Sequence, residues 1–421
     1  MLAPSPGGSR RHDYVWAVVD QVAISGGRFL VGWTLARLAT REEYGAFVLA
    51  YAVLLTVEIV QAGLVTWPMA VLGPGQGAGF PAYVSGALRL QLGLGAVLSL
   101  LVLASAGVAA IATPASLVPK AIAAAALATF GVQLQEFVRR VLLTQSRPLA
   151  ALGIDGVGTT IQVIGLALLA WRAGSALGST AAFLLLAGSS LAAALLGVLQ
   201  FRGLLRDRSG PVTALLRENW QFGRWICGSR LGEGLLSHAS TFVIAGFVGA
   251  RGAAELEAPR LLVAPLQIVA FGLVNLLLPR GATILEQGSP AVLRAYVRRA
   301  AGRVGVAFGA YGALLVAFPA LSLRLAFAGR YDDAVVLALW AAAHVLLGVR
   351  VILSTSLYVM RRSDLMMIAT LAAGLVGLAA AVPLSARFGP AGPAAARAAA
   401  ELGLIAGVTL LSQRAEREAR A

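Results

Sequence analysis

The stretch 84-VSGALRLQLGLGAVLSLLVLASAGVAA-110 contains a single charged residue, Arg89. A helix needs about 20 mainly apolar residues to cross a bilayer, so this stretch predicts a membrane span. The composition extends the prediction to the whole chain, because 58% of the 421 residues are hydrophobic, 13% are charged and the mean hydropathy is +0.81. Soluble domains carry about 25% charged residues. These values exclude a cytosolic enzyme, a secreted domain and a disordered chain.

The same length rule predicts twelve spans and therefore an all-α polytopic membrane protein. The longest polar connection, 201–219, lies near the midpoint of the chain. It predicts two six-helix bundles, residues 1–208 and residues 209–421. The predicted spans are 14–38, 44–72, 84–110, 117–143, 149–171, 180–204, 219–248, 256–278, 300–325, 334–360, 365–384 and 393–411.

Basic residues are unevenly divided between the two sides that these spans define. One side carries nineteen Lys and Arg residues and the other carries nine. Cytoplasmic loops are enriched in Lys and Arg, so we expect both termini in the cytoplasm. The net charge of +15 follows from arginines that punctuate apolar stretches. It therefore predicts contact with anionic membrane lipids rather than with nucleic acid.

A short motif recurs half a chain apart. Arg140 begins R-V-L-L-T and is followed by Asp155, whereas Arg350 begins R-V-I-L-S and is followed by Asp364. The offset of 210 residues places the fourth span over the tenth, which indicates a parallel duplication. Repeats of this kind place the substrate between the halves. Chance similarity between two Arg-capped apolar helices is the alternative.

No catalytic or metal-binding constellation is visible in the sequence. Lys120 is the only lysine and lies in V-P-K-A, so no phosphate-binding loop of the G-x-x-x-x-G-K-[ST] type exists. Cys227 is the only cysteine, and the three histidines, His12, His238 and His344, are far apart. We expect a secondary transporter or flippase, which is not an enzyme and has no cofactor.

Polar residues within spans usually face a cavity, because they are costly in lipid. In the first span, Gln21, Ser25 and Arg28 recur at helical spacing. Arginine binds phosphate through a planar fork and keeps its charge. We therefore predict that an anionic lipid head group binds to Arg28, Arg89, Arg230, Gln21 and Ser25.

A second set of intramembrane residues is suited to carry H⁺ or Na⁺ for coupling, because burial shifts the ionisation of such groups. For any single member, an ion pair that serves folding alone is the alternative, and Arg230 with Glu233 is such a pair at i,i+3. The predicted ion-coupling residues are Asp20, Glu58, Asp155, Glu233 and His238, and the carboxylate of Glu401 is a similar buried group.

Three stretches carry a resemblance to a known family. They are 29-FLVGWTLARLATREEYGAF-47, 65-VTWPMAVLGP-74 and 139-RRVLLTQSRPLAALGID-155. The first helix ends in an L-A-R-x-L-like run, a Glu/Tyr-Gly turn follows, and the second helix ends near a Pro. This arrangement resembles the Wzx-type polysaccharide flippases of the multidrug/oligosaccharidyl-lipid/polysaccharide (MOP) exporter superfamily. Lipid II flippases of that superfamily carry an Arg-Asp pair in the first helix, whereas here Phe29 follows Arg28.

The resemblance implies a MATE-like, V-shaped arrangement of two bundles with a cationic central cavity and alternating access. It implies translocation of an undecaprenyl-diphosphate-linked oligosaccharide from the cytoplasmic to the outer leaflet of the bacterial inner membrane. Glycan polymerases and glycosyltransferases of the same pathway are then the expected protein partners. Two alternatives stay open, a MATE-like drug or metabolite antiporter and a membrane glycan polymerase or ligase.

Overall fold

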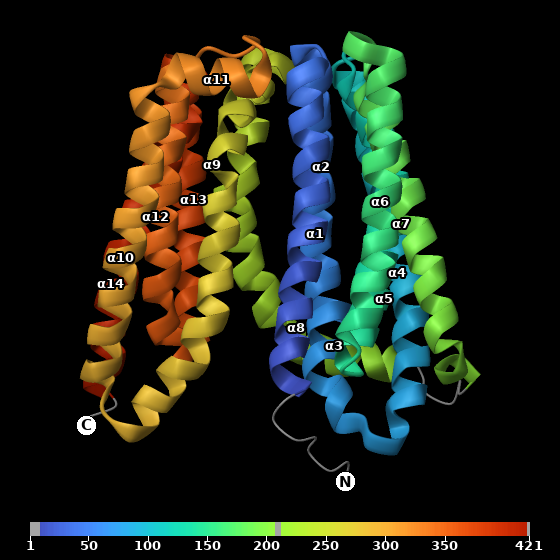
Figure 1. Cartoon of the computed structure of the whole chain (residues 1–421), viewed down its shortest axis with the longest axis vertical. Helices are drawn as coiled ribbons and strands as arrows, with labels where there is room; N and C mark the ends of the chain where they lie inside the picture. Colours follow the sequence, from blue (N-terminus) through green and yellow to red (C-terminus); the bar gives the residue numbers. More distant parts are fainter. Residues whose placement is uncertain (1–8, 207–211, 419–421) are drawn as a thin grey trace. The chain divides into compact units, whose positions relative to one another are not determined.

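The computed structural model describes residues 9–206 and 212–418, except for the side chains of 9–22, 175, 206 and 275. Throughout these residues the regular structure is helical (Figure 1). The chain divides into two compact units, Met1–Cys227 and Gly228–Ala421.

The first unit contains seven α-helices, the start of an eighth and four short turns of 3-10 or π-helix. Their bounds are α1 Ser9–Leu38, α2 Arg41–Gln61, η1 Ala62–Thr66, α3 Trp67–Leu72, η2 Gly73–Gly79, α4 Phe80–Ala112, α5 Val118–Thr144, α6 Pro148–Ala173, η3 Gly174–Ala176, α7 Ser179–Phe201, η4 Arg202–Arg206 and α8 Val212–Gly234. The second unit takes the end of α8 and continues with η5 Leu235–Ala239, α9 Ser240–Gln287, α10 Pro290–Ala317, α11 Pro319–Phe327, α12 Ala334–Val359, α13 Ser363–Phe388 and α14 Ala391–Glu418.

Nine helical stretches among the described residues are long and apolar enough to cross a membrane. Two of them run over 72 and 76 residues, and each contains a glycine with positive φ where the helix turns. These are Gly77 (φ 53°) and Gly249 (φ 75°), a backbone conformation that side chains with a Cβ avoid. If both stretches are divided at these glycines and α1 is added, the described residues form twelve helical segments, the number of spans that the hydropathy pattern predicts.

One predicted span ends in the wrong place. The ninth was expected to cover 300–325, but α10 ends at Ala317 and a separate helix, α11, begins at Pro319. Proline lacks the backbone N–H that would continue a helix and restricts the residue before it. Figure 1 shows α11 lying across the rods of its own unit rather than along them.

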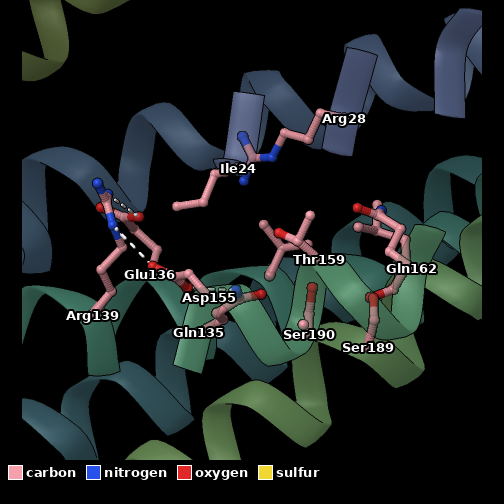
Figure 2. A pocket seen from close by; sticks show the side chains of 13 residues that line it. Ile24, Arg28, Gln135, Glu136, Arg139, Asp155, Thr159, Gln162, Ser189 and Ser190 are labelled. Carbon is pink, nitrogen blue, oxygen red and sulfur yellow. Dashed lines mark hydrogen bonds and ion pairs between the residues drawn. The ribbon is translucent and has the colours of Figure 1, made fainter. Parts of the chain in front are cut away.

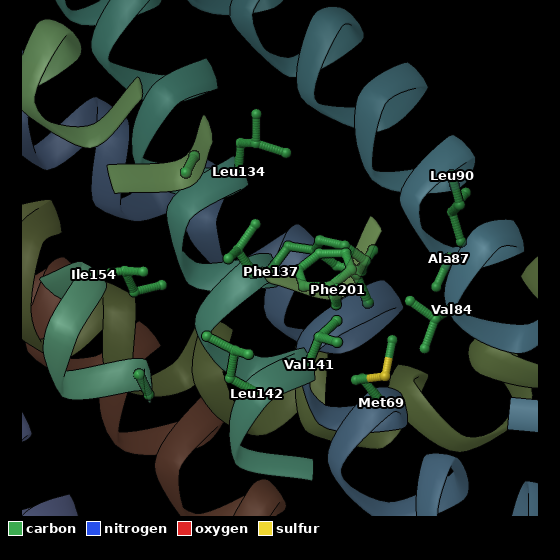
Figure 3. Close-up of a cluster of buried hydrophobic side chains, with 14 of the residues drawn as sticks. Met69, Val84, Ala87, Leu90, Leu134, Phe137, Val141, Leu142, Ile154 and Phe201 are labelled. Atoms are coloured by element: carbon green, nitrogen blue, oxygen red, sulfur yellow. The ribbon is translucent and has the colours of Figure 1, made fainter. Parts of the chain in front are cut away.

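Helix α5 forms the centre of the first unit. Its side chains Phe137, Val138, Val141 and Leu142 are fully buried and meet residues of η1, α3, α4, α6 and α7 in one cluster (Figure 3). The N-terminal half of α5 is rich in buried alanines, which let neighbouring helices approach closely. In lipid such close packing, rather than water exclusion, holds helices together. The corresponding helix of the second unit is α12. Among the nine apolar helical stretches, α5 and α12 have the largest buried fractions.

The boundary between the units differs from the predicted division at 208/209. The first half of α8 packs on the first unit because Asn219, which is fully buried, donates a hydrogen bond to the Leu64 carbonyl at 2.7 Å. Leu64 lies in the π-helical turn η1, and the backbones of Gly63 and Gly223 touch. The predicted V shape and central cavity between the two bundles stay predictions.

Candidate functional site

A polar cavity of about 30 Å³ lies inside the first unit, between α1, α5, α6 and α7 (Figure 2). Its apolar lining is limited to Ile24, Val132 and Leu186. The remaining side chains that line it supply charges, amides and hydroxyls. They are Arg28 from α1, Gln135, Glu136 and Arg139 from α5, Asp155, Thr159 and Gln162 from α6, and Ser189 and Ser190 from α7.

Arg139 organises one wall of this cavity. Its Nε lies 3.2 Å from Oδ2 of Asp155, and its Nη1 lies 3.1 Å from Oε2 of Glu136. Gln135 donates a hydrogen bond of 2.7 Å to Oδ1 of Asp155. Because Arg140 also binds Glu136 at 2.9 Å, the carboxylates of this wall are occupied by neighbouring donors. The wall is therefore held in a fixed arrangement of charges.

Arg28 stands opposite, in a looser arrangement. Its Nη2 lies 3.9 Å from Oε1 of Glu58, at the limit of an ion pair, and its side chain keeps 35% of its surface exposed. The Tyr51 hydroxyl is a second neighbour. An ion pair with an N–O distance this long and a partly solvated guanidinium contributes little free energy, so the guanidinium can leave its partner at low cost. Arg28 is therefore the cation of the cavity that is available to an incoming anion.

The chemistry of this lining suits a hydroxyl-rich anion. Gln, Ser and Thr side chains both donate and accept hydrogen bonds, as sugar hydroxyls require, and a guanidinium forms two parallel bonds to a phosphate. Among the described residues, no group of three His, Cys, Asp or Glu is placed to hold a metal ion.

A second cluster of charges lies within the second unit. Arg350 binds Glu233 at 2.9 Å and Glu401 at 2.7 Å, while Arg397 binds Glu401 at 2.6 Å. Arg350 and Arg397 are 2% and 5% exposed. This cluster is compact and internally paired, so its first role is to hold α8, α12 and α14 together.

The structure brings together two of the predicted residues at the cavity, Arg28 and Asp155, with Glu58 beside Arg28. Ser25 is half-buried on the same helix. Arg89 is exposed on α4, where its Nε donates to the Ser85 carbonyl at 3.4 Å, and it does not line the cavity. The side chains of Asp20 and Gln21 lie outside the described residues.

The remaining predicted residues belong to the second unit. Arg230 is exposed on α8, and Glu233 is taken by Arg350 rather than held only by its neighbour Arg230. His238 lies half-buried in the π-helical turn η5. The repeat motif is only partly reflected in the structure, because Asp155 is fully buried whereas Asp364 has 56% of its side chain exposed beside Arg362.

Sequence reasoning missed most of the cavity wall. Arg139, within the predicted span 117–143, contributes there only to the uneven division of basic residues between the two sides, yet it lines the cavity and is 9% exposed. Glu136 and the amides of Gln135 and Gln162 were not singled out. A usable signal existed, because a buried Asp155 requires a cation, and R139-R140 is the nearest basic pair in the chain.

Comparison by sequence finds no matching family profile and no matching curated protein. Comparison by structure finds an inward-facing multidrug resistance MATE family transporter of the MOP superfamily, with a TM-score of 0.81 at 14% identity, covering 95% of this chain and 96% of that one. The lipid II flippase MurJ, in an inward closed conformation, matches with a TM-score of 0.70 at 12% identity over 94% and 87% of the two chains.

A third match is a MOP superfamily transporter from Pyrococcus furiosus, described by a binding pocket of reverse polarity. Its TM-score is 0.64 at 11% identity, with 99% of this chain and 98% of that chain covered. This chain has the MOP-superfamily fold. Together with its apolar helical stretches, the fold makes it a multi-pass membrane protein.

Proposed function

We propose that this MOP-fold chain is a flippase that moves a polyprenyl-diphosphate-linked oligosaccharide from the cytoplasmic to the outer leaflet of the bacterial inner membrane. The observation that carries the proposal is Arg28, a partly exposed cation in a cavity that also contains amides and hydroxyls and whose other charges, Glu136, Arg139 and Asp155, pair with one another. Diphosphate would bind the guanidinium, and sugar hydroxyls match the uncharged lining.

The fold supports transport as the general activity, because the structures it resembles are described as transporters and a lipid II flippase. The resemblance of 29–74 and 139–155 to Wzx-type flippases favours a glycan carrier. The small cavity accommodates at most a part of a head group, so Arg28 acts as one contact along a route between leaflets. Coupling to H⁺ or Na⁺ through Glu58 or Asp155 belongs to the same proposal.

Reconstitution into liposomes tests the proposal. Undecaprenyl-diphosphate bearing a fluorescently labelled oligosaccharide is incorporated, and an impermeant reductant then bleaches the label in the outer leaflet. We expect the protein to make the inner-leaflet label accessible, which empty liposomes do not. R28A should slow this exchange at least about tenfold and R28K should retain part of it, because loss of a charge-assisted phosphate contact costs about 1.5–3 kcal/mol.

The same liposomes distinguish the second candidate, a MATE-like cation antiporter. Asp155 and Glu136 favour it, because both carboxylates line the cavity. An imposed H⁺ or Na⁺ gradient that drives ethidium efflux, with no exchange of the lipid-linked glycan, would replace the flippase proposal with this one.

The third alternative, a glycan polymerase or ligase, needs an outer loop large enough to hold an acceptor. Within residues 9–206 and 212–418 the links between helices are short, and the longest runs from Ala328 to Asp333. These short links disfavour a polymerase or ligase.

A further inference from the structure

One end of the second unit gathers the ends of four long helices. Arg294 near the start of α10 binds Glu416 near the end of α14 at 2.8 Å. Arg362, in the turn between α12 and α13, binds Glu418 of α14 at 2.5 Å. The backbone of Gly281 in α9 lies against Leu293 and Val359. These contacts place the turn from α9 to α10 beside the ends of α12 and α14.

The carboxylates at this end are largely used by ion pairs within the unit. Glu416 binds Arg294, Glu418 binds Arg362 and Arg414, and Asp364 binds Arg362. Glu286 is the remaining carboxylate there. Six arginines at this end have no ion pair with any described carboxylate, so positive charge is in excess over the single carboxylate of Glu286. They are Arg280, Arg298, Arg299, Arg303, Arg361 and Arg417.

Three of these arginines are concentrated on the exposed side of α10. Arg299 and Arg303 are one helical turn apart, and the same stripe continues through Val306, Ala310 and Leu314. Val306 is 75% exposed and Leu314 is 60% exposed. The outer face of α10 is thus cationic along its first half and apolar along its second half.

The length of α10 places the change from charge to apolar surface at the membrane boundary. Its 28 residues span about 42 Å, whereas the hydrocarbon core is about 30 Å thick. If the apolar end of the helix crosses this core, Arg298 and Arg299 lie at a membrane interface. Arg303 is one turn deeper and reaches the interface with its long side chain.

We propose that this face of α10 binds an anionic phospholipid. The phosphate is held by Arg298, Arg299 and Arg303, and an acyl chain lies along Val306 and Leu314. Guanidinium groups bind phosphate bidentately, and the exposed apolar stripe supplies the contact that a water-soluble phosphate ester does not use. The proposal concerns a lipid that surrounds the protein and does not depend on which substrate is transported.

Lipid retention measured by native mass spectrometry tests the site. The purified protein is mixed in detergent with phosphatidylglycerol or phosphatidylethanolamine, and the variant R298Q/R299Q/R303Q is compared with wild type. A basic residue near an anionic surface contributes about 1 kcal/mol, which is about fivefold in affinity. We therefore expect the triple variant to lose about 100-fold in phosphatidylglycerol affinity at low salt, with little change for phosphatidylethanolamine.

A matched control removes the same charge elsewhere in the unit. R251Q/R324Q/R387Q replaces three exposed arginines outside the α10 face, and it should retain wild-type phosphatidylglycerol binding. The proposal is overturned if both variants lose binding equally, or if wild type retains the two lipids equally. It is also overturned if glycerophosphoglycerol, which has the head group and no acyl chains, displaces the lipid at equal concentration.

Discussion

Arg350 of α12 and Glu401 of α14 form a buried ion pair, with 2.7 Å between Nε and Oε2. The same guanidinium binds both oxygens of Glu233, at 2.9 and 3.3 Å, and Arg397 binds the other oxygen of Glu401 at 2.6 Å. Two arginines and two glutamates therefore neutralise one another within the second unit. Charges removed from water are stable only while their partners are present.

We predict that R350L destabilises the protein strongly. It leaves Glu233 with only the more distant charges of Arg397 and Arg230 and leaves Glu401 with Arg397 alone, and breaking a buried pair costs about 3–5 kcal/mol. Thermal unfolding in detergent, followed by tryptophan fluorescence, measures the effect. R361L removes an exposed arginine just after the same helix and should leave the melting temperature unchanged. Equal melting temperatures of R350L and wild type would contradict the structural role of the cluster.

Glu43 lies in the first turn of α2, within the E-E-Y-G stretch that follows the first helix. Its carboxylate accepts hydrogen bonds from the backbone N–H of Ser179 at 2.7 Å and from the Ser179 hydroxyl at 2.6 Å. Ser179 is the first residue of α7, so Glu43 satisfies a free donor at a helix N-terminus, where a negative charge is favourable.

E43A should therefore lower the free energy of unfolding by about 1–2 kcal/mol, with a lower melting temperature as the readout. E42A is the matched control, because Glu42 is the preceding residue, carries the same charge and is exposed. The role assigned to Glu43 fails if the two variants melt together.

The contact between Glu43 and Ser179 also shows what the sequence can and cannot predict in this chain. Hydropathy alone places the twelve rods, because each must be apolar over the bilayer thickness, and it predicts that Asp155 is buried. The sequence does not predict which side chains bind one another across helices. Ser179 is 136 residues from Glu43, and no local spacing encodes which of two adjacent glutamates faces it. Arg139 lies near the end of the predicted span 117–143, where a basic residue is expected at the membrane interface, and only the packing of α5 on α6 shows that it binds Asp155.

Gly223 of α8 and Gly63 of η1 form a close backbone contact. A Cβ on Gly223 would lie 1.7 Å from the Gly63 carbonyl oxygen, and backbone atoms cannot yield as a flexible side chain does. We predict that G223A displaces α8 and costs about 3 kcal/mol or more, at the upper end of overpacking effects. G93A, at an exposed position of α4 with no atom within 4 Å, should instead be neutral or stabilising, because Ala is the better helix former. Limited proteolysis and thermal unfolding of both variants give the comparison.

Gly27 sets the distance between α1 and the cavity wall, and its replacement should separate activity from stability. A Cβ there would lie 2.9 Å from Oε1 of Gln162 and 3.2 Å from Cγ2 of Thr159, and both side chains line the cavity with Arg28. The amide of Gln162 is flexible enough to move aside, so the melting temperature of G27A should stay close to wild type. Displacement of Gln162 alters the cavity, and misplacement of a positioning group by about 1 Å can cost about 100-fold in rate. We therefore expect exchange of the labelled lipid-linked glycan to slow at least about tenfold in G27A.

G26A is the matched control. It has no atom within 4 Å of its new methyl group and should exchange the lipid-linked glycan at the wild-type rate. Equal rates for G26A and G27A would remove this wall from the transport route.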